Sequence, residues 1–166
     1  MKKTALLIAL AFFSLTAYAQ TVPDITAAYA GMKFRVPGSP LIVGSIGANN
    51  DILLIKYSDS VGKRYISFST ENTLEAGDCG WTEFFEATLS AKEIYGCDRA
   101  SVESFKSVFV QGTDSGTWKI ANRAYYYFLS AQDPSFVFFQ SKDGNLIKLE
   151  SDFLDSDGFR AILAGS

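Results

Sequence analysis

The stretch TWKIANRAYYYFLSAQDPSFVFFQSKDGNLIKLE, from Thr117 to Glu150, decides the fold. Its apolar runs predict three antiparallel strands, at Thr117–Leu129, Phe136–Lys142 and Asn145–Glu150. The dipeptide Asp143-Gly144 separates the last two runs, and both of its residues tolerate the positive φ of a two-residue hairpin turn. An antiparallel meander is therefore expected in this part of the chain.

The faces of this meander follow from the turn. A two-residue turn places the following side chains on one face of the sheet: Phe136, Phe138, Ile147 and Leu149. On the strand before them, side-chain alternation groups tyrosines with cations on one face, with further side chains expected nearby. Because tyrosine and arginine dominate protein interfaces, this group is the candidate partner-binding surface: Lys119, Arg123, Tyr125, Tyr127, Phe139 and Lys148. The alternative interpretation is an aromatic layer beneath helices, with the cations at its edge.

The chain before this meander predicts further strands and a short helix. Within 20–31, Asp24 can cap a helix that Gly31 ends. Turn-rich segments then separate a second set of expected strands: Lys33–Val36, Leu41–Ile46, Ile52–Tyr57 and Arg64–Thr70. The two meanders are expected to join into one antiparallel sheet of about five to six strands.

A helical insert, about 71–111, separates the two meanders. In its first helix the apolar side chains recur at helical spacing: Trp81, Phe84, Phe85, Thr88 and Leu89. A second helix is expected after the capping residue Asp98, with a buried stripe formed by Val102, Phe105, Val108 and Phe109. A last helix follows Asp155 or Ser156.

Segregated strands and helices indicate an α+β fold, in which helices pack on an antiparallel sheet. The order of the elements also resembles the α/β/α sandwiches of the PsbP/Mog1 type, in which helices flank an antiparallel sheet. This resemblance is one of layout, with no shared motif, and it implies no activity.

Residues 1–19 have the pattern of an export signal. Lys2 and Lys3 precede the apolar run Thr4–Leu15, and Ala17-Tyr18-Ala19 supplies small residues for cleavage. We therefore expect a single domain at 20–166 in the periplasm or the medium, without a membrane anchor after cleavage. Two of the 15 basic residues lie in the signal, so the remainder has a net charge of −5 against 18 acidic residues. This charge argues against nucleic-acid binding and is compatible with a basic protein partner.

Cys79 and Cys97 are the two cysteines of the chain. In an oxidising compartment an even cysteine count predicts a disulfide. The rival interpretations are a metal pair or a redox pair, but the Cys-x-x-Cys spacing typical of redox sites is absent.

The chemistry available to the chain is narrow because it contains no histidine. This excludes Ser-His-Asp and Cys-His catalysis and the usual zinc sites. Ser60-Val61-Gly62-Lys63 matches the spacing of serine–lysine acyl enzymes but falls in a turn, and Glu83 with Glu86 fits a solvated helix face. We expect no catalytic residues, no metal and no cofactor.

Three functions remain. The first is binding of a protein partner without catalysis, as an inhibitor, an immunity-type protein or an accessory factor of the envelope. The alternative is a carrier of a small apolar or aromatic ligand held between sheet and helices, which would require a closed cavity of several hundred Å³. The third is an enzyme that depends on carboxylates.

Overall fold

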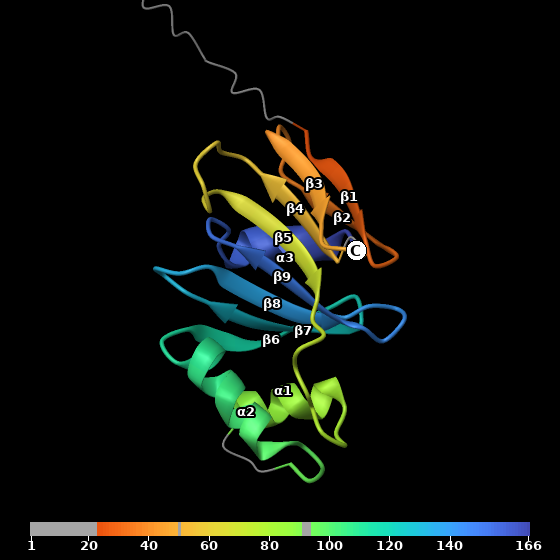
Figure 1. Ribbon diagram of the computed structural model, residues 1–166, viewed down its shortest axis with the longest axis vertical. Helices are drawn as coiled ribbons and strands as arrows, with labels where there is room; N and C mark the ends of the chain where they lie inside the picture. Colours follow the sequence, from red (N-terminus) through yellow and green to blue (C-terminus); the bar gives the residue numbers. More distant parts are fainter. Residues whose placement is uncertain (1–22, 50, 91–93) are drawn as a thin grey trace, which may run out of the picture.

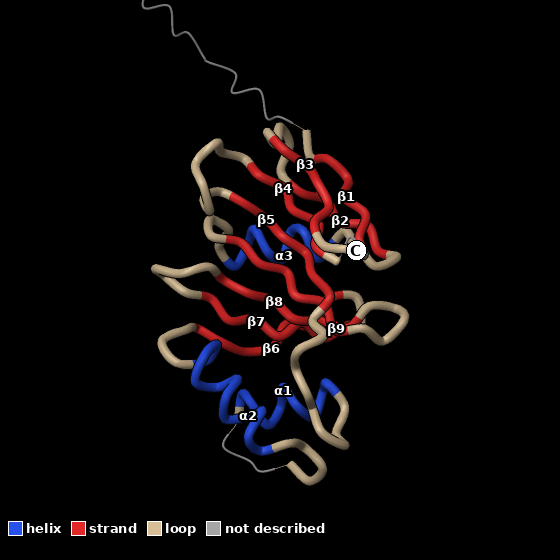
Figure 2. The backbone as a smooth tube through the Cα atoms, viewed as in Figure 1, coloured by secondary structure: helices blue, strands red, loops and turns tan. Residues whose placement is uncertain are grey.

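The computed structural model describes residues 23–49, 51–90 and 94–166. In chain order its elements are β1 (Ile25–Tyr29), β2 (Met32–Val36), β3 (Ile42–Ile46), β4 (Ile52–Lys56), β5 (Tyr65–Thr70), α1 (Trp81–Leu89), α2 (Arg99–Phe105), the π-helical segment η1 (Lys106–Val110), β6 (Asp114–Ile120), β7 (Arg123–Leu129), β8 (Ser135–Gln140), β9 (Leu146–Ser151) and α3 (Ser156–Ala164). They form an α+β fold around a seven-stranded antiparallel sheet in the order β3-β4-β5-β9-β8-β7-β6 (Figures 1 and 2). β1 and β2 form a separate two-stranded hairpin.

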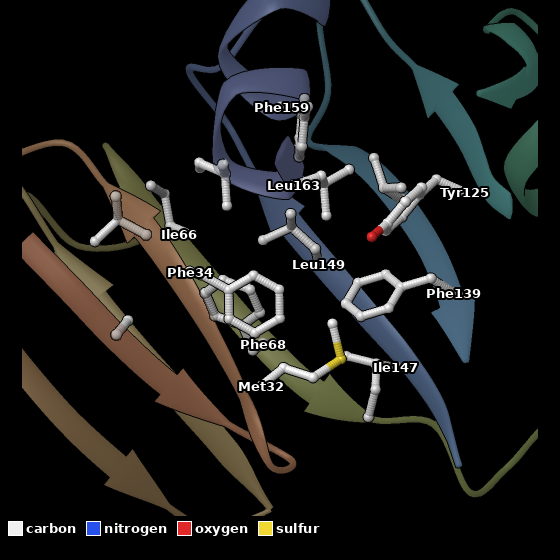
Figure 3. Packing of buried hydrophobic residues seen from close by; sticks show 14 of the residues in the cluster. Met32, Phe34, Ile66, Phe68, Tyr125, Phe139, Ile147, Leu149, Phe159 and Leu163 are labelled. Carbon is white, nitrogen blue, oxygen red and sulfur yellow. The ribbon is translucent and has the colours of Figure 1, made fainter. Parts of the chain in front are cut away.

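The hairpin β1–β2 and the helix α3 pack on one face of the sheet. Figure 3 shows Phe34 from the hairpin against Phe68 of β5, and the two ring centroids lie 4.5 Å apart. Phe139 of β8 lies on the same side of the sheet, and its ring centroid is 6.0 Å from that of Phe34. Helix α3 adds Phe159, which has no exposed surface. These residues are the centre of the larger of two hydrophobic cores.

The helices α1 and α2 cover the opposite face over β7, β8 and β9. Phe85 of α1 is fully buried and stacks on Tyr126 of β7 at 4.3 Å between centroids. Phe105 of α2 packs on Phe128 and Phe138 of the sheet. Six of the nine buried residues of this second core are aromatic, so rings fill much of the space between sheet and helices.

The register between β8 and β9 differs from the predicted one. The Ser141 N–H donates a hydrogen bond to the Asn145 carbonyl at 2.9 Å, so these two residues close the hairpin. The loop between them holds three residues, Lys142-Asp143-Gly144, and Gly144 has a positive φ of 83°. Phe138 therefore lies opposite Lys148, and Phe139 lies opposite Ile147. A shift of one residue turns every side chain to the other face, so the predicted grouping of Phe136 and Phe138 with Ile147 and Leu149 is wrong.

The predicted strand Thr117–Leu129 is two strands. Ala121 and Asn122 both have positive φ, 46° and 66°, and make a tight turn between β6 and β7. Trp118 consequently lies opposite Tyr125 and on the same face, whereas alternation along one continuous strand would put the two side chains on opposite faces. Alanine is uncommon at positive φ, so the dipeptide Ala121-Asn122 did not indicate a turn in the sequence.

The helix predicted within 20–31 is wrong where the structure describes it. Residues 20–22 lie outside the described ranges, and Ile25–Tyr29 is strand β1. Gly31, predicted to end the helix, forms with Ala30 the turn into β2, both at positive φ. The hairpin buries Ala27 and Phe34 in the core, and this burial outweighs local helix propensity.

The other helices agree with their predictions. The Asp98 carboxylate accepts a hydrogen bond from Ser101 N–H at 2.7 Å, and Asp155 accepts one from Gly158 N–H at 2.8 Å, so both residues are caps. The predicted buried stripe is wrong at Val108, which is 66% exposed. The π-helical turn after Phe105 is wider than an α-turn, so it keeps Phe109 stacked on Phe105 and rotates Val108 outward.

The disulfide prediction is confirmed. Cys79 and Cys97 are bonded, with their Cα atoms 4.8 Å apart. The bridge joins the segment before α1 to the residue before the Asp98 cap of α2. A disulfide of this kind is compatible with an oxidising, extracytoplasmic location.

Candidate functional site

The six residues predicted to bind a partner do not form one surface. Tyr125 is 2% exposed and Phe139 is fully buried, and their rings lie 5.3 Å apart in the core shown in Figure 3. The Tyr125 hydroxyl lies 3.0 Å from the Ser166 hydroxyl. Both residues stabilise the fold from inside, where no partner can reach them.

Arg123 and Tyr127 lie at the edge of this core. Tyr127 stacks on Trp118 at 4.4 Å, and the Arg160 guanidinium lies 5.1 Å from the Trp118 ring. The Arg123 guanidinium contacts the Met32 sulfur at 3.1 Å. This arrangement agrees with the alternative interpretation of an aromatic layer edged by cations. A role for Arg123 and Tyr127 in binding stays a prediction.

Lys119 and Lys148 lie on the opposite face of the sheet. Lys119 is exposed opposite Ala124. The Lys148 ammonium lies 3.5 Å from the Glu150 carboxylate and 5.7 Å from the Phe136 ring centroid. Both lysines are separated from Arg123 and Tyr127 by the thickness of the sheet, so their binding role stays a separate prediction.

Glu150 also accepts a hydrogen bond from the Tyr65 hydroxyl. Burial raises the pKa of Tyr65, and the hydrogen bond and negative charge of Glu150 raise it further. A raised pKa in the folded state stabilises the protein below the pKa of an unfolded tyrosine, about 10, and this contribution is lost as the pH rises through the folded pKa.

We therefore expect Glu150→Gln to shift the ionisation of Tyr65 to lower pH, because the substitution removes the neighbouring charge. The measurement is a titration of tyrosinate absorbance, in which subtraction of the Tyr65→Phe curve isolates the Tyr65 step. An unchanged Tyr65 step in Glu150→Gln would show that Glu150 does not interact with this hydroxyl.

The charge of the chain is concentrated in residues 71–111, which we call the helical lobe. The lobe has eight acidic and three basic residues, a net charge of −5, whereas the chain as a whole has −3. The rest of the chain has twelve basic residues, including Lys2 and Lys3, and ten acidic residues. The exposed acidic residues of the lobe that the structure describes are Glu75, Asp78, Glu83, Glu86, Asp98 and Glu103.

An open groove of about 350 Å³ crosses the helical lobe. It is lined by Thr73, Leu74, Glu75, Ala100, Ser101, Ser104, Phe105, Val108 and Phe109. Five of these nine lining residues are apolar, and Glu75 supplies an exposed carboxylate. Glu71 lies at the same end of the lobe, since its carboxylate accepts a hydrogen bond from Thr73 N–H at 2.9 Å.

Of the two cations on α2–η1, Arg99 is exposed next to the lining residue Ala100, and Lys106 is paired. The Lys106 ammonium lies 3.4 Å from the Glu103 carboxylate, and neither residue lines the groove. The groove therefore offers apolar contact in a segment whose net charge is negative, with Glu75 in its lining. The groove was not predictable from the sequence because only the fold brings Thr73–Glu75 to α2–η1, whereas the charge of the segment is visible in the sequence.

The fragments considered for catalysis lie on the surface. Ser60 and Lys63 are both exposed in the turn between β4 and β5. Glu83 and Glu86 are exposed on α1. Within the ranges that the structure describes, no group of His, Cys, Asp or Glu side chains could hold a metal ion.

Comparison with protein-family models, with curated proteins and with solved structures finds no match to this chain. None of the helices in the described ranges has the length and apolarity needed to cross a membrane.

Proposed function

We propose that this chain is an exported protein that acts without catalysis, by binding a positively charged segment of a partner protein on its helical lobe. The observation that carries the proposal is the coincidence of an apolar groove with the whole net negative charge of the chain. Export to the periplasm or the medium is inferred from the signal-like residues 1–19 and is supported by the disulfide.

Charge and apolar surface have different roles in such an interface. The field of the lobe steers a basic partner and raises the rate of association. An apolar side chain of the partner then fills the groove against Phe105, Val108 and Phe109. Exposed Val108 supports this step, because a well-packed apolar contact at the centre of an interface contributes most of the affinity.

The packed interior favours binding at the surface over the carrier alternative. A ligand held between sheet and helices would need the space that Phe85, Phe105 and Tyr126 fill with their rings. The groove, by contrast, is open to solvent. An enzyme that depends on carboxylates finds little support, because the acidic residues of the lobe are spread over its exposed surface.

The test is a comparison of two charge reversals. Glu75→Lys changes the groove wall, whereas Asp59→Lys changes an exposed residue of the β4–β5 turn by the same charge. With each variant immobilised as bait in envelope extract of the source organism, we expect a partner retained by wild type and Asp59→Lys and lost from Glu75→Lys. For the purified pair, Glu75→Lys should weaken binding about tenfold, or about 1.4 kcal/mol.

Salt and an apolar variant complete the test. Raising the ionic strength should weaken the wild-type interaction, since exposed charges are screened. Val108→Ser should weaken binding without changing this salt dependence, because it removes apolar contact and no charge. Equal retention of a partner by Glu75→Lys and wild type would refute the proposal.

A further inference from the structure

Among the residues that the structure describes, no strand pairs with the outer side of β3 in the seven-stranded sheet. β3 pairs with β4 on one side, and it is the end strand of the sheet order. Four large apolar side chains in and beside it are at least half exposed: Leu41 (62%), Ile42 (54%), Val43 (54%) and Ile46 (50%). They include side chains from both faces of the strand. Apolar surface of this kind on a free edge is a template for pairing with another strand.

The other edge of the same sheet is protected. β6 carries exposed Asp114 and Lys119, which discourage the approach of another strand. β3, with the sequence IVGSI, contains no charge and no proline. The two edges therefore differ in the features by which sheet proteins prevent edge-to-edge association.

The sequence of β3 is nearly symmetrical about Gly44. In an antiparallel pair centred on this residue, Ile42 lies opposite Ile46 of a second copy, and Val43 lies opposite Ser45 of that copy. Ile42, Gly44 and Ile46 share one face with Ile52 and Leu54 of β4, which are half-buried, and with Lys56 beside Ile42. A two-fold axis at Gly44 would join the apolar residues of both copies into one strip, with Lys56 of each copy at its sides.

We propose that β3 pairs antiparallel with β3 of a second copy of this chain, and forms a two-fold dimer with a continuous sheet. A two-fold interface uses the same patch on both copies, and β3 meets that requirement through its near-symmetry. The inference does not depend on the proposed function, because β3 and the helical lobe lie at opposite ends of the molecule (Figure 1).

The charge distribution favours a second copy as the occupant. Two acidic chains repel each other, but here the net negative charge lies in the lobe, far from β3. Copies that meet at β3 place their lobes at the two far ends of the dimer, where salt screens them from each other. The edge strand carries no charge to select an oppositely charged foreign strand.

The first measurement is the solution mass by sedimentation equilibrium over a range of concentrations. Wild type should approach twice the chain mass as the concentration rises. Ile42→Lys should remain at the mass of one chain with an unchanged circular dichroism spectrum, because it puts a charged side chain opposite Ile46 at each end of the seam and its own side chain is already half exposed. A wild-type protein that stays monomeric throughout would overturn the proposal.

The second measurement tests the register by cross-linking. Gly44→Cys places two thiols across the two-fold axis, at a Cα separation of about 4.5–5.5 Å that a disulfide can span. A Cβ at Gly44 meets no atom within 4 Å, so the substitution fits the fold. Ser45→Cys is the matched control: its Cα atoms in the two copies would be offset by two residues, about 7 Å along the strand, in addition to the spacing between strands.

We expect mild oxidation to give a covalent dimer of Gly44→Cys and little of Ser45→Cys. Equal cross-linking of both variants, or of neither, would refute the Gly44-centred pair. Retention of an unrelated chain by wild type but not by Ile42→Lys, with wild type itself monomeric, would assign β3 to a foreign strand and overturn the inference.

Discussion

Replacing Phe85 by alanine is expected to lower the free energy of unfolding by about 3–5 kcal/mol. Phe85 has no exposed surface and occupies the centre of the aromatic core between helices and sheet. Its ring stacks on Tyr126 and lies within 5.6 Å, centroid to centroid, of Phe105 and Phe138. The variant loses the transfer free energy of the ring and leaves a cavity that three other rings cannot close. Chemical denaturation followed by circular dichroism measures the change.

Phe136→Ala is the matched control, because it removes the same ring from a half-buried position beside Phe109 and Lys148. Its expected cost is smaller, since part of its surface is exposed in the folded state. A cost for Phe85→Ala no larger than that for Phe136→Ala would mean that the helices do not pack on the sheet as described.

The elements that local chemistry determines were predictable from the sequence. Helices α2 and α3 begin after Asp98 and Asp155 because an aspartate side chain satisfies free N–H groups of the first turn. The disulfide followed from an even cysteine count in a chain with an export pattern. These inferences needed no knowledge of which elements meet in space.

The candidate binding surface was not predictable in the same way, because it depended on two turns. With two residues between β8 and β9, Phe139 would face Lys148; with three, it faces Ile147 inside the core. Asp143-Gly144 suits both turn types, and only packing distinguishes them. The missed Ala121-Asn122 turn had a similar effect on Lys119, which it moved to the face opposite Tyr125.

The two proposed interaction surfaces escaped sequence analysis for a further reason. A run such as Ile42–Ile46 is typical of any strand, and its exposure follows from its place at the end of the sheet. The groove likewise requires Thr73–Glu75 and α2–η1 to be brought together by the fold. Segment charge, in contrast, is visible in the sequence, and it would have singled out the helical lobe.

The two proposals combine in one physical arrangement. A dimer through β3 would carry an acidic lobe at each end, so that each copy binds its own basic segment. Two linked sites gain avidity only where a partner presents two segments at a matching distance. Ile42→Lys would then reduce avidity without changing the affinity of a single lobe, whereas Glu75→Lys would reduce both.

Removal of the disulfide is expected to cost about 3 kcal/mol of the free energy of unfolding. Cys79 and Cys97 close a loop with a sequence separation of 18, and the chain-entropy estimate for a loop of this size gives that value. The bridge also holds a close backbone approach, since a Cβ at Gly77 would lie 2.7 Å from Asp98 N. The double variant Cys79→Ser/Cys97→Ser, compared with wild type by chemical denaturation, measures the cost.

The loss of local stability should be greatest in the helical lobe, because the disulfide joins the segments that precede α1 and α2. Hydrogen exchange should therefore accelerate at Phe84, Phe85 and Val102 more than at Phe68 or Leu149 of the sheet. Reductant should lower the stability of wild type to that of the double variant and leave the variant unchanged. A double variant as stable as wild type, with unchanged exchange in α1 and α2, would show that packing of Phe85 and Phe105 alone holds the lobe on the sheet.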